Sequence, residues 1–135
     1  MPPTIKSFGF RHGLTISGDI VFSPNPTKKR DPWFIVGTPG ISEAFVVDVR
    51  RLLPKNPYHD KKLRKLRGDS PEVIAELEHT PGIEKAYHEL LGVVSKINHP
   101  VYIGCTGGHH RSVYIANRLG KDLNIPVEHL NYHDK

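Results

Sequence analysis

A strand, a glycine turn and a helix follow one another in residues 100–123, and this segment constrains the fold more than any other. Residues 101–104 are apolar, Gly107 and Gly108 form the predicted turn, and an apolar face recurs at helical spacing after residue 111. The N–H groups of such a turn and of the helix N-terminus point into one small volume, which suits phosphate or another compact anion. The segment therefore predicts an anion-binding loop near the C-terminal end of a sheet.

Alternating strand and helix patterns along the rest of the chain predict an α/β layered sandwich with a mixed, partly parallel sheet. Apolar or β-branched runs predict strands at residues 5–10, 33–36, 44–49, 101–104 and 125–131, with a short strand or a helical turn at 19–22. Apolar residues at helical spacing predict helices that begin near residues 71, 83 and 111. Ser70 is expected to cap the first helix, and Glu84 stands near the position of a capping box in the second.

Composition limits the classes of protein to consider. The 135 residues predict one domain without repeats, and the single cysteine excludes an internal disulfide. No run approaches the ~20 apolar residues that span a bilayer, so a cytoplasmic protein without membrane association is expected. A net charge of +5 favours polyanions or anionic metabolites as partners.

Polar and small side chains gather in the loop and at the ends of the neighbouring strands. Arg111 falls in the first turn of its helix, where a cation is unfavourable unless an anion binds beside it. The alternative is an ordinary glycine turn with an arginine at the surface. We predict that the ligand site comprises the loop Cys105, Thr106, Gly107, Gly108, His109, His110, Arg111 and Ser112, together with Asp48, Arg50 and His59.

The spacing of Cys105, Arg111 and Ser112 also matches the C-x5-R-[S/T] pattern of cysteine-dependent phosphatases. In that chemistry a thiolate attacks phosphorus while the arginine binds the equatorial oxygens. A general acid is needed as well, and the sequence ties neither Asp31 nor Asp60 to the loop. A small, half-buried cysteine at a strand end is the alternative. Adjacent histidines diverge, so no metal site and no cofactor is predicted.

Residues 61–67 hold five basic side chains, which could bind a phosphate backbone or could form an ordinary solvated loop. The residues predicted to contact RNA are Lys61, Lys62, Arg64, Lys65 and Arg67. Tyr58 beside them could stack on a base.

Three sequence blocks resemble a known family. Residues 103–116, which include Cys-Thr-Gly-Gly-x-His-Arg-Ser, resemble the signature of the C-terminal domain of the RNase adapter protein RapZ family. Residues 7–13 and the block from Asp48 to Arg64 resemble the same family in the same order. The resemblance implies a domain that binds small regulatory RNA, senses an amino-sugar phosphate and has no chemistry of its own. It places the phosphate pocket at Cys105–Gly108 and Arg111, with Asp48 and Arg50 nearby.

The chain also departs from that family. It contains no G-x4-G-K-[ST] motif, an additional stretch occupies residues 23–43, and Tyr58 stands where the family has a histidine. We therefore predict a stand-alone, non-enzymatic module that senses a phosphorylated metabolite and binds RNA, with a cysteine-dependent phosphatase as the alternative. A protein partner and oligomerisation, with the additional stretch as an interface, are further expectations.

Overall fold

A computed structural model describes residues 1–16, 18–22, 24, 45–50, 52–53, 57–131 of the chain. The predicted strand at 33–36 and nearly all of the additional stretch 23–43 lie outside these residues. The strands are β1 (Ile5–Gly9), β2 (Leu14–Ile16), β3 (Asp19–Phe22), β4 (Phe45–Asp48), β5 (Val101–Cys105) and β6 (Val127–His129). The helices are α1 (Pro71–Glu78), α2 (Ile83–Val94) and α3 (Arg111–Leu123), with two short 3-10 turns, η1 (Phe10–His12) and η2 (Pro57–His59).

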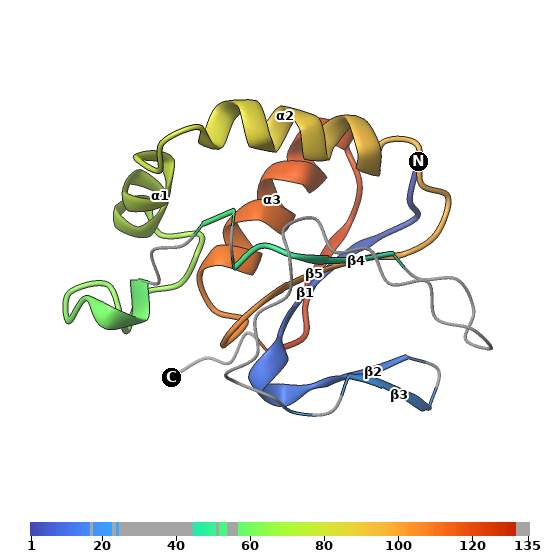
Figure 1. The fold of residues 1–135 in the computed structure, drawn as a ribbon, viewed down its shortest axis with the longest axis horizontal. Coiled ribbons are helices and arrows are strands. Elements are labelled where there is room, and N and C mark those ends of the chain that lie inside the picture. Colours follow the sequence, from blue (N-terminus) through green and yellow to red (C-terminus); the bar gives the residue numbers. More distant parts are fainter. Residues whose placement is uncertain (17, 23, 25–44, 51, 54–56, 132–135) are drawn as a thin grey trace.

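Four strands form a parallel sheet in the order β4-β5-β1-β6 (Figure 1). Strand β1 is central, and its Ile5 pairs with Val101 on one side and Val127 on the other. Strands β2 and β3 form a separate antiparallel hairpin. The predicted α/β class is confirmed, and residues 19–22 are a strand rather than a helical turn.

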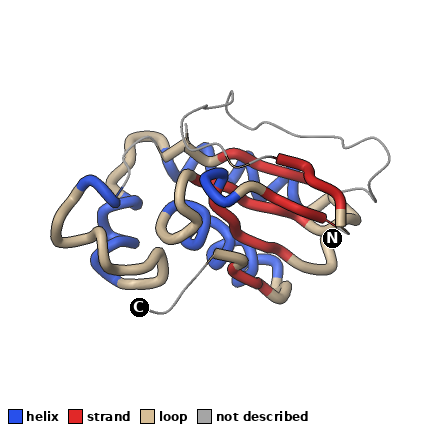
Figure 2. The backbone as a smooth tube through the Cα atoms, turned by 90° about the horizontal axis from the view of Figure 1, so that it is seen from below, coloured by secondary structure: helices blue, strands red, loops and turns tan. Residues whose placement is uncertain are grey.

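The sheet is apolar on both faces, as expected for parallel strands covered on each side. Alternate residues such as Val47 and Ile103 pack with the three helices in one core, whereas Val46 and Tyr102 face a second core with Phe8, Phe10 and the β2–β3 hairpin. Figure 1 shows the helices above the sheet and the hairpin below it. Figure 2, seen from below, shows helical segments behind the strands and others beside the sheet.

The helices begin where the sequence predicts, but their first turns are held differently. Ser70 is the N-cap residue of α1, yet its hydroxyl donates to the carbonyl of Arg67 rather than accepting from a helical amide. Glu84 makes no capping box; its carboxylate forms an ion pair with Arg118 of α3 at 2.6 Å. The first turn of α2 is therefore tied to α3 by a cross-helix contact that local spacing does not reveal.

Candidate functional site

The loop of residues 106–110 joins the end of β5 to the start of α3, at the C-terminal edge of the sheet. Its shape depends on a close contact with the end of β1. Gly108 has φ +78°, and a Cβ there would lie 2.7 Å from the backbone nitrogen of Gly9. A Cβ on Gly9 would lie 2.4 Å from the carbonyl carbon of Gly107. Two glycines are thus needed where strand and loop meet backbone to backbone.

Cys105 is held on the inner side of the loop. Its Sγ accepts the N–H of Gly108 at 3.3 Å and lies 3.2 Å from the hydroxyl oxygen of Ser112, to which the thiol donates. Both Cys105 and Ser112 are buried. The sulfur therefore has polar partners from the loop and from the first turn of α3.

Arg111 is turned toward the protein. Its Nη1 donates to the carbonyl of Leu53 at 3.0 Å, and its Nη2 donates to the hydroxyl of Thr106 at 3.1 Å. Its Nε is buried and has no hydrogen-bond partner among the described residues. The guanidinium links the chain after β4 to the loop after β5.

Asp48 and Arg50 form a buried ion pair at the end of β4, with Nη2 and Oδ2 2.8 Å apart. The Arg50 guanidinium also lies over the ring of Phe10, 4.2 Å from its centroid. This stacking fixes η1, which carries Arg11 and His12. The pair therefore supports η1 without lining the pocket itself.

The buried charges near the loop do not balance. Among the described residues that are buried, Arg50 and Arg111 are cationic, whereas Asp48 is the only carboxylate, and it is paired with Arg50. Burial lowers the pKa of Arg111, because a desolvated guanidinium is less stable when charged. A buried charge without a counter-charge is costly, so a nearby anion would stabilise the folded protein.

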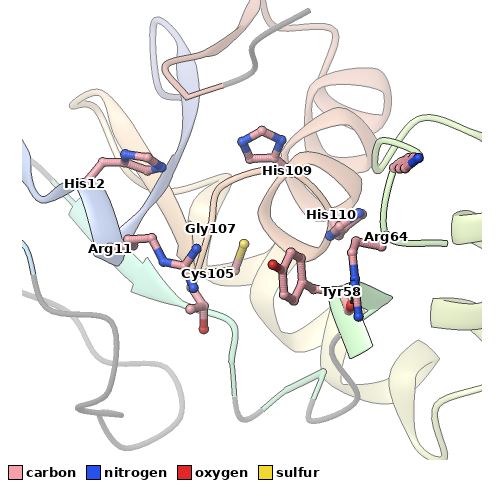
Figure 3. Close-up of a pocket in the computed structure, with 10 residues that line it drawn as sticks. Arg11, His12, Tyr58, Arg64, Cys105, Gly107, His109 and His110 are labelled. Atoms are coloured by element: carbon pink, nitrogen blue, oxygen red, sulfur yellow. Dashed lines mark hydrogen bonds between the residues drawn. The ribbon is translucent and has the colours of Figure 1, made fainter. Parts of the chain in front are cut away.

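A pocket of about 720 Å³ opens in front of the loop. Figure 3 shows Arg11 and His12 on one side, Tyr58, Arg64 and His110 on the other, and Cys105, Gly107 and His109 between them. None of the lining residues carries a carboxylate, within the part of the chain described. The lining residues are Arg11, His12, Tyr58, Arg64, Lys65, Cys105, Thr106, Gly107, His109 and His110.

The backbone of the loop adds donors to this basic pocket. In the described structure, no acceptor is found for the N–H groups of Gly107, His110 and Arg111. A Cβ at Gly107 would meet only the His109 ring, at 4.0 Å, so the glycine leaves open space on the pocket side. Burial lowers the pKa of His110, although the nearby backbone groups of Leu66, Leu63 and Arg64 act in the opposite direction. A bound anion could accept from several of these groups.

The predicted site residues divide between the pocket wall and its support. Five loop residues line the pocket, and Arg64 and Lys65 of the basic segment line it as well. The other predicted residues do not line it. Gly108, Arg111, Ser112, Asp48 and Arg50 support or flank the loop, His59 ends η2 beside Tyr58, and Lys61, Lys62 and Arg67 continue the basic segment outside the pocket.

Arg11 was not predicted as a site residue, although it stands in the Phe-Gly-Phe-Arg-His-Gly block. Its amide donates to the carbonyl of Thr106 at 3.0 Å, which places η1 beside the loop. The signal that could identify it is topological. Strands β1 and β5 are parallel neighbours, so the residues that follow both of them meet at one edge.

The basic segment is anchored to the core. Leu63 is buried among the apolar residues of the helical core, whereas Lys61, Lys62, Arg64 and Lys65 are exposed. The carboxylate of Asp60 accepts the N–H of Lys62 at 2.8 Å, and its carbonyl accepts the N–H of Arg64 at 2.8 Å. The exposed charges are therefore presented on a turn of defined shape.

The described residues contain no group of three or more histidine, cysteine, aspartate or glutamate side chains arranged to hold a metal ion. No helix among them has the length and apolar character needed to cross a membrane.

Comparison with known proteins gives consistent matches. The family model of the RapZ C-terminal domain matches residues 34–134. A nucleotide-binding protein of Ectopseudomonas mendocina is 33% identical over 135 residues, which cover 93% of this chain and 38% of that protein. Nucleotide-binding proteins of Pseudomonas putida and Azotobacter vinelandii are each 34% identical over 140 residues, covering 93% of this chain and 40% of each of theirs.

The chain thus spans about two-fifths of the length of these curated relatives. Its matched region contains β4, the loop, the basic segment and all three helices. The chain belongs to the family of the RapZ C-terminal domain.

Proposed function

We propose that this chain is a binding module for a phosphorylated metabolite, with the phosphate held in the pocket in front of residues 105–110. The observation that carries the proposal is the charge of the site. Cationic residues line the pocket, no described lining residue is acidic, and the buried Arg111 beside it lacks a carboxylate of its own. The nucleotide-binding names of the relatives are compatible with a phosphorylated ligand.

Isothermal titration with inorganic phosphate, glucosamine 6-phosphate and ribose 5-phosphate tests this function. Arg64→Gln removes a pocket cation and should weaken binding about tenfold, since a hydrogen bond to a charged group contributes about 1.5 kcal/mol. Lys121→Gln is the matched control, because Lys121 is exposed in the last turn of α3. Equal losses of affinity in both variants would mean that binding depends on the net charge of the protein and not on Arg64. Absence of binding by the wild type would refute the proposal.

Within this function, an amino-sugar phosphate is the ligand class that the family resemblance implies, and glucosamine 6-phosphate represents it in the titration. RNA would contact the exposed lysines outside the pocket, and the module would act as an adapter between metabolite and RNA.

Binding of a small RNA should weaken steeply with salt. The double variant Lys61→Gln/Lys62→Gln should lower RNA affinity and reduce that salt dependence, while phosphate binding stays unchanged.

One observation favours a second candidate, a cysteine-dependent phosphatase. Cys105 is one of the residues that line the pocket, and its Sγ accepts the Gly108 N–H in the loop that leads into α3, a position suited to a nucleophilic cysteine. The engagement of both Arg111 terminal nitrogens with Leu53 and Thr106 argues against it. Turnover of p-nitrophenyl phosphate that is abolished by Cys105→Ser would establish catalysis, and absence of turnover would leave the binding function.

A further inference from the structure

The pocket is larger than a phosphate group requires. Its volume of about 720 Å³ falls in the range of ~300–1,000 Å³ that accommodates whole small-molecule ligands. The glycine loop, with its amides and the open space at Gly107, supplies the features that suit phosphate. The remaining wall must contact the rest of the ligand, and that wall contains Tyr58.

Tyr58 presents an aromatic ring whose position is fixed. The residue is 45% exposed, and its ring lies over the Arg64 guanidinium, 4.8 Å from ring centroid to Cζ. Arg64 Nε also donates to the Tyr58 carbonyl at 2.8 Å. Figure 3 shows the ring between Arg64 and Cys105. A ring already held by a guanidinium loses little conformational freedom when a planar group stacks on it.

The polarity of the lining narrows the class of planar group. No carboxylate lines the described pocket, so a cationic group on the ligand would meet Arg11, Arg64 and Lys65 without a counter-charge. A neutral aromatic group avoids this repulsion and gains both stacking on tyrosine and attraction to the adjacent guanidinium. A nucleotide combines a neutral planar base with a phosphate, which a sugar of suitable length joins to it.

We propose that the pocket binds a nucleoside 5′-phosphate, with the phosphate at the glycine loop and the base stacked on Tyr58. This inference rests on the anion-binding function proposed above and adds the class of ligand. The base accounts for the aromatic wall that a sugar phosphate leaves without a role. The same chemistry is offered by a free mononucleotide and by the 5′-phosphorylated end of an RNA.

Titration of matched ligands isolates the contribution of the base. Adenosine 5′-monophosphate and ribose 5-phosphate share the sugar and the phosphate, so the ratio of their Kd values reports the base alone. We expect a ratio of at least about fivefold in the wild type, the lower limit for stacking of one base on an aromatic side chain. Tyr58→Phe should keep this ratio and Tyr58→Leu should reduce it to near one, through weaker binding of the nucleotide. Urea unfolding of each variant verifies that it is folded, and Tyr58→Ala is a second test if the leucine variant is not.

The outcomes separate this inference from the function on which it rests. Equal affinity of the wild type for the two ligands, or a ratio unchanged in a folded Tyr58→Leu variant, overturns the nucleoside assignment and leaves phosphate binding intact. Failure to bind inorganic phosphate, ribose 5-phosphate and the nucleotide removes both proposals. A trinucleotide with and without its 5′-phosphate then distinguishes the sources. Tyr58-dependent binding of the phosphorylated form alone points to an RNA end, and preference for the mononucleotide points to a free metabolite.

Discussion

The two sides of the loop after β5 are built from the same short stretch of sequence, yet they obey different physical constraints. On the packed side, the backbones of Gly9 and Gly108 are so close that a Cβ on either would lie within 2.7 Å of the other segment. On the open side, a Cβ on Gly107 would find its nearest neighbour at 4.0 Å. Adjacent glycines in one motif therefore have separate reasons to be glycine.

The same division applies to the two arginines that border the loop. Arg111 is buried and bound to protein oxygens, whereas Arg11 is exposed and lines the pocket. A residue can thus belong to a ligand-binding motif because it shapes the loop and not because it contacts the ligand. Substitutions on the packed side should change stability first, and those on the open side should change affinity alone.

Gly9→Ala should have the largest effect on stability. The added methyl group overlaps the carbonyl of Gly107, so β1 and the loop must separate, at a cost of about 2–4 kcal/mol in the free energy of unfolding. Urea unfolding measures the loss. The matched change Gly107→Ala should stay within about 0.5 kcal/mol of the wild type and should weaken phosphate binding, because the methyl group enters the pocket. Similar stability losses in both variants would remove the distinction between the two sides.

Arg111→Lys should have the next largest effect. Lysine keeps the charge but cannot reach both the buried Leu53 carbonyl and the partly buried Thr106 hydroxyl, so one of these acceptors loses its donor. We expect the free energy of unfolding to fall by about 1–2 kcal/mol. Arg64→Lys, the same exchange at an exposed site, serves as the control and should leave stability within about 0.5 kcal/mol. If Arg111→Lys is as stable as the wild type, the guanidinium does not tie Leu53 to the loop.

Arg11→Gln tests the open side. The exposed side chain makes no described hydrogen bond, and the amide that fixes η1 to Thr106 is retained. We expect unchanged stability and phosphate affinity lowered several-fold, since one charged hydrogen bond contributes about 1.5 kcal/mol. Titration calorimetry measures the affinity and urea unfolding the stability. A stability loss without a change in affinity would place Arg11 among the supporting residues.

The sequence predicts the architecture well because its signals are local. Apolar runs give β1, β4 and β5, and helical periodicity gives α2 and α3. The sequence does not predict hairpin strand β2, because Leu14-Thr15-Ile16 is too short to show a pattern and is a strand only through its pairing with β3. Glu84 was assigned to a cap because its partner, Arg118, lies 34 residues away in α3.

The site is predictable in position and less so in detail. The glycine loop and the ends of the parallel strands identify its location, since ligands bind at the C-terminal ends of such strands. The direction of the Arg111 side chain depends on the Leu53 carbonyl, which no spacing in the sequence places beside it. The contribution of Arg11 depends on the adjacency of β1 and β5. Facts of this kind arise from tertiary contacts and not from motifs.

Two histidines extend the comparison to the dependence of stability on pH, and this effect should be the smallest. Burial lowers the pKa of His110 in the pocket wall and of His129 in β6, both from an ordinary value of 6.5. His129 is held between the Ser7 hydroxyl at 2.5 Å and the Asn117 side-chain oxygen at 2.9 Å. In the unfolded chain these histidines take up protons near pH 6.5, whereas in the folded chain they do so only at lower pH. The free energy of unfolding should therefore be highest above pH 6.5 and decline as the pH falls below that value.

The two histidines should respond differently to phosphate. An anion in the pocket favours the protonated form of His110, so saturating phosphate should reduce its part of the decline, whereas His129 lies away from the pocket lining. His129→Gln should remove the part due to His129, so that phosphate suppresses a larger share of the decline that remains. Urea unfolding between pH 5 and 8, with and without phosphate, measures both contributions. A decline that phosphate leaves untouched in the His129→Gln variant would mean that the anion does not bind next to His110, and it would locate the binding site away from the open side of the loop.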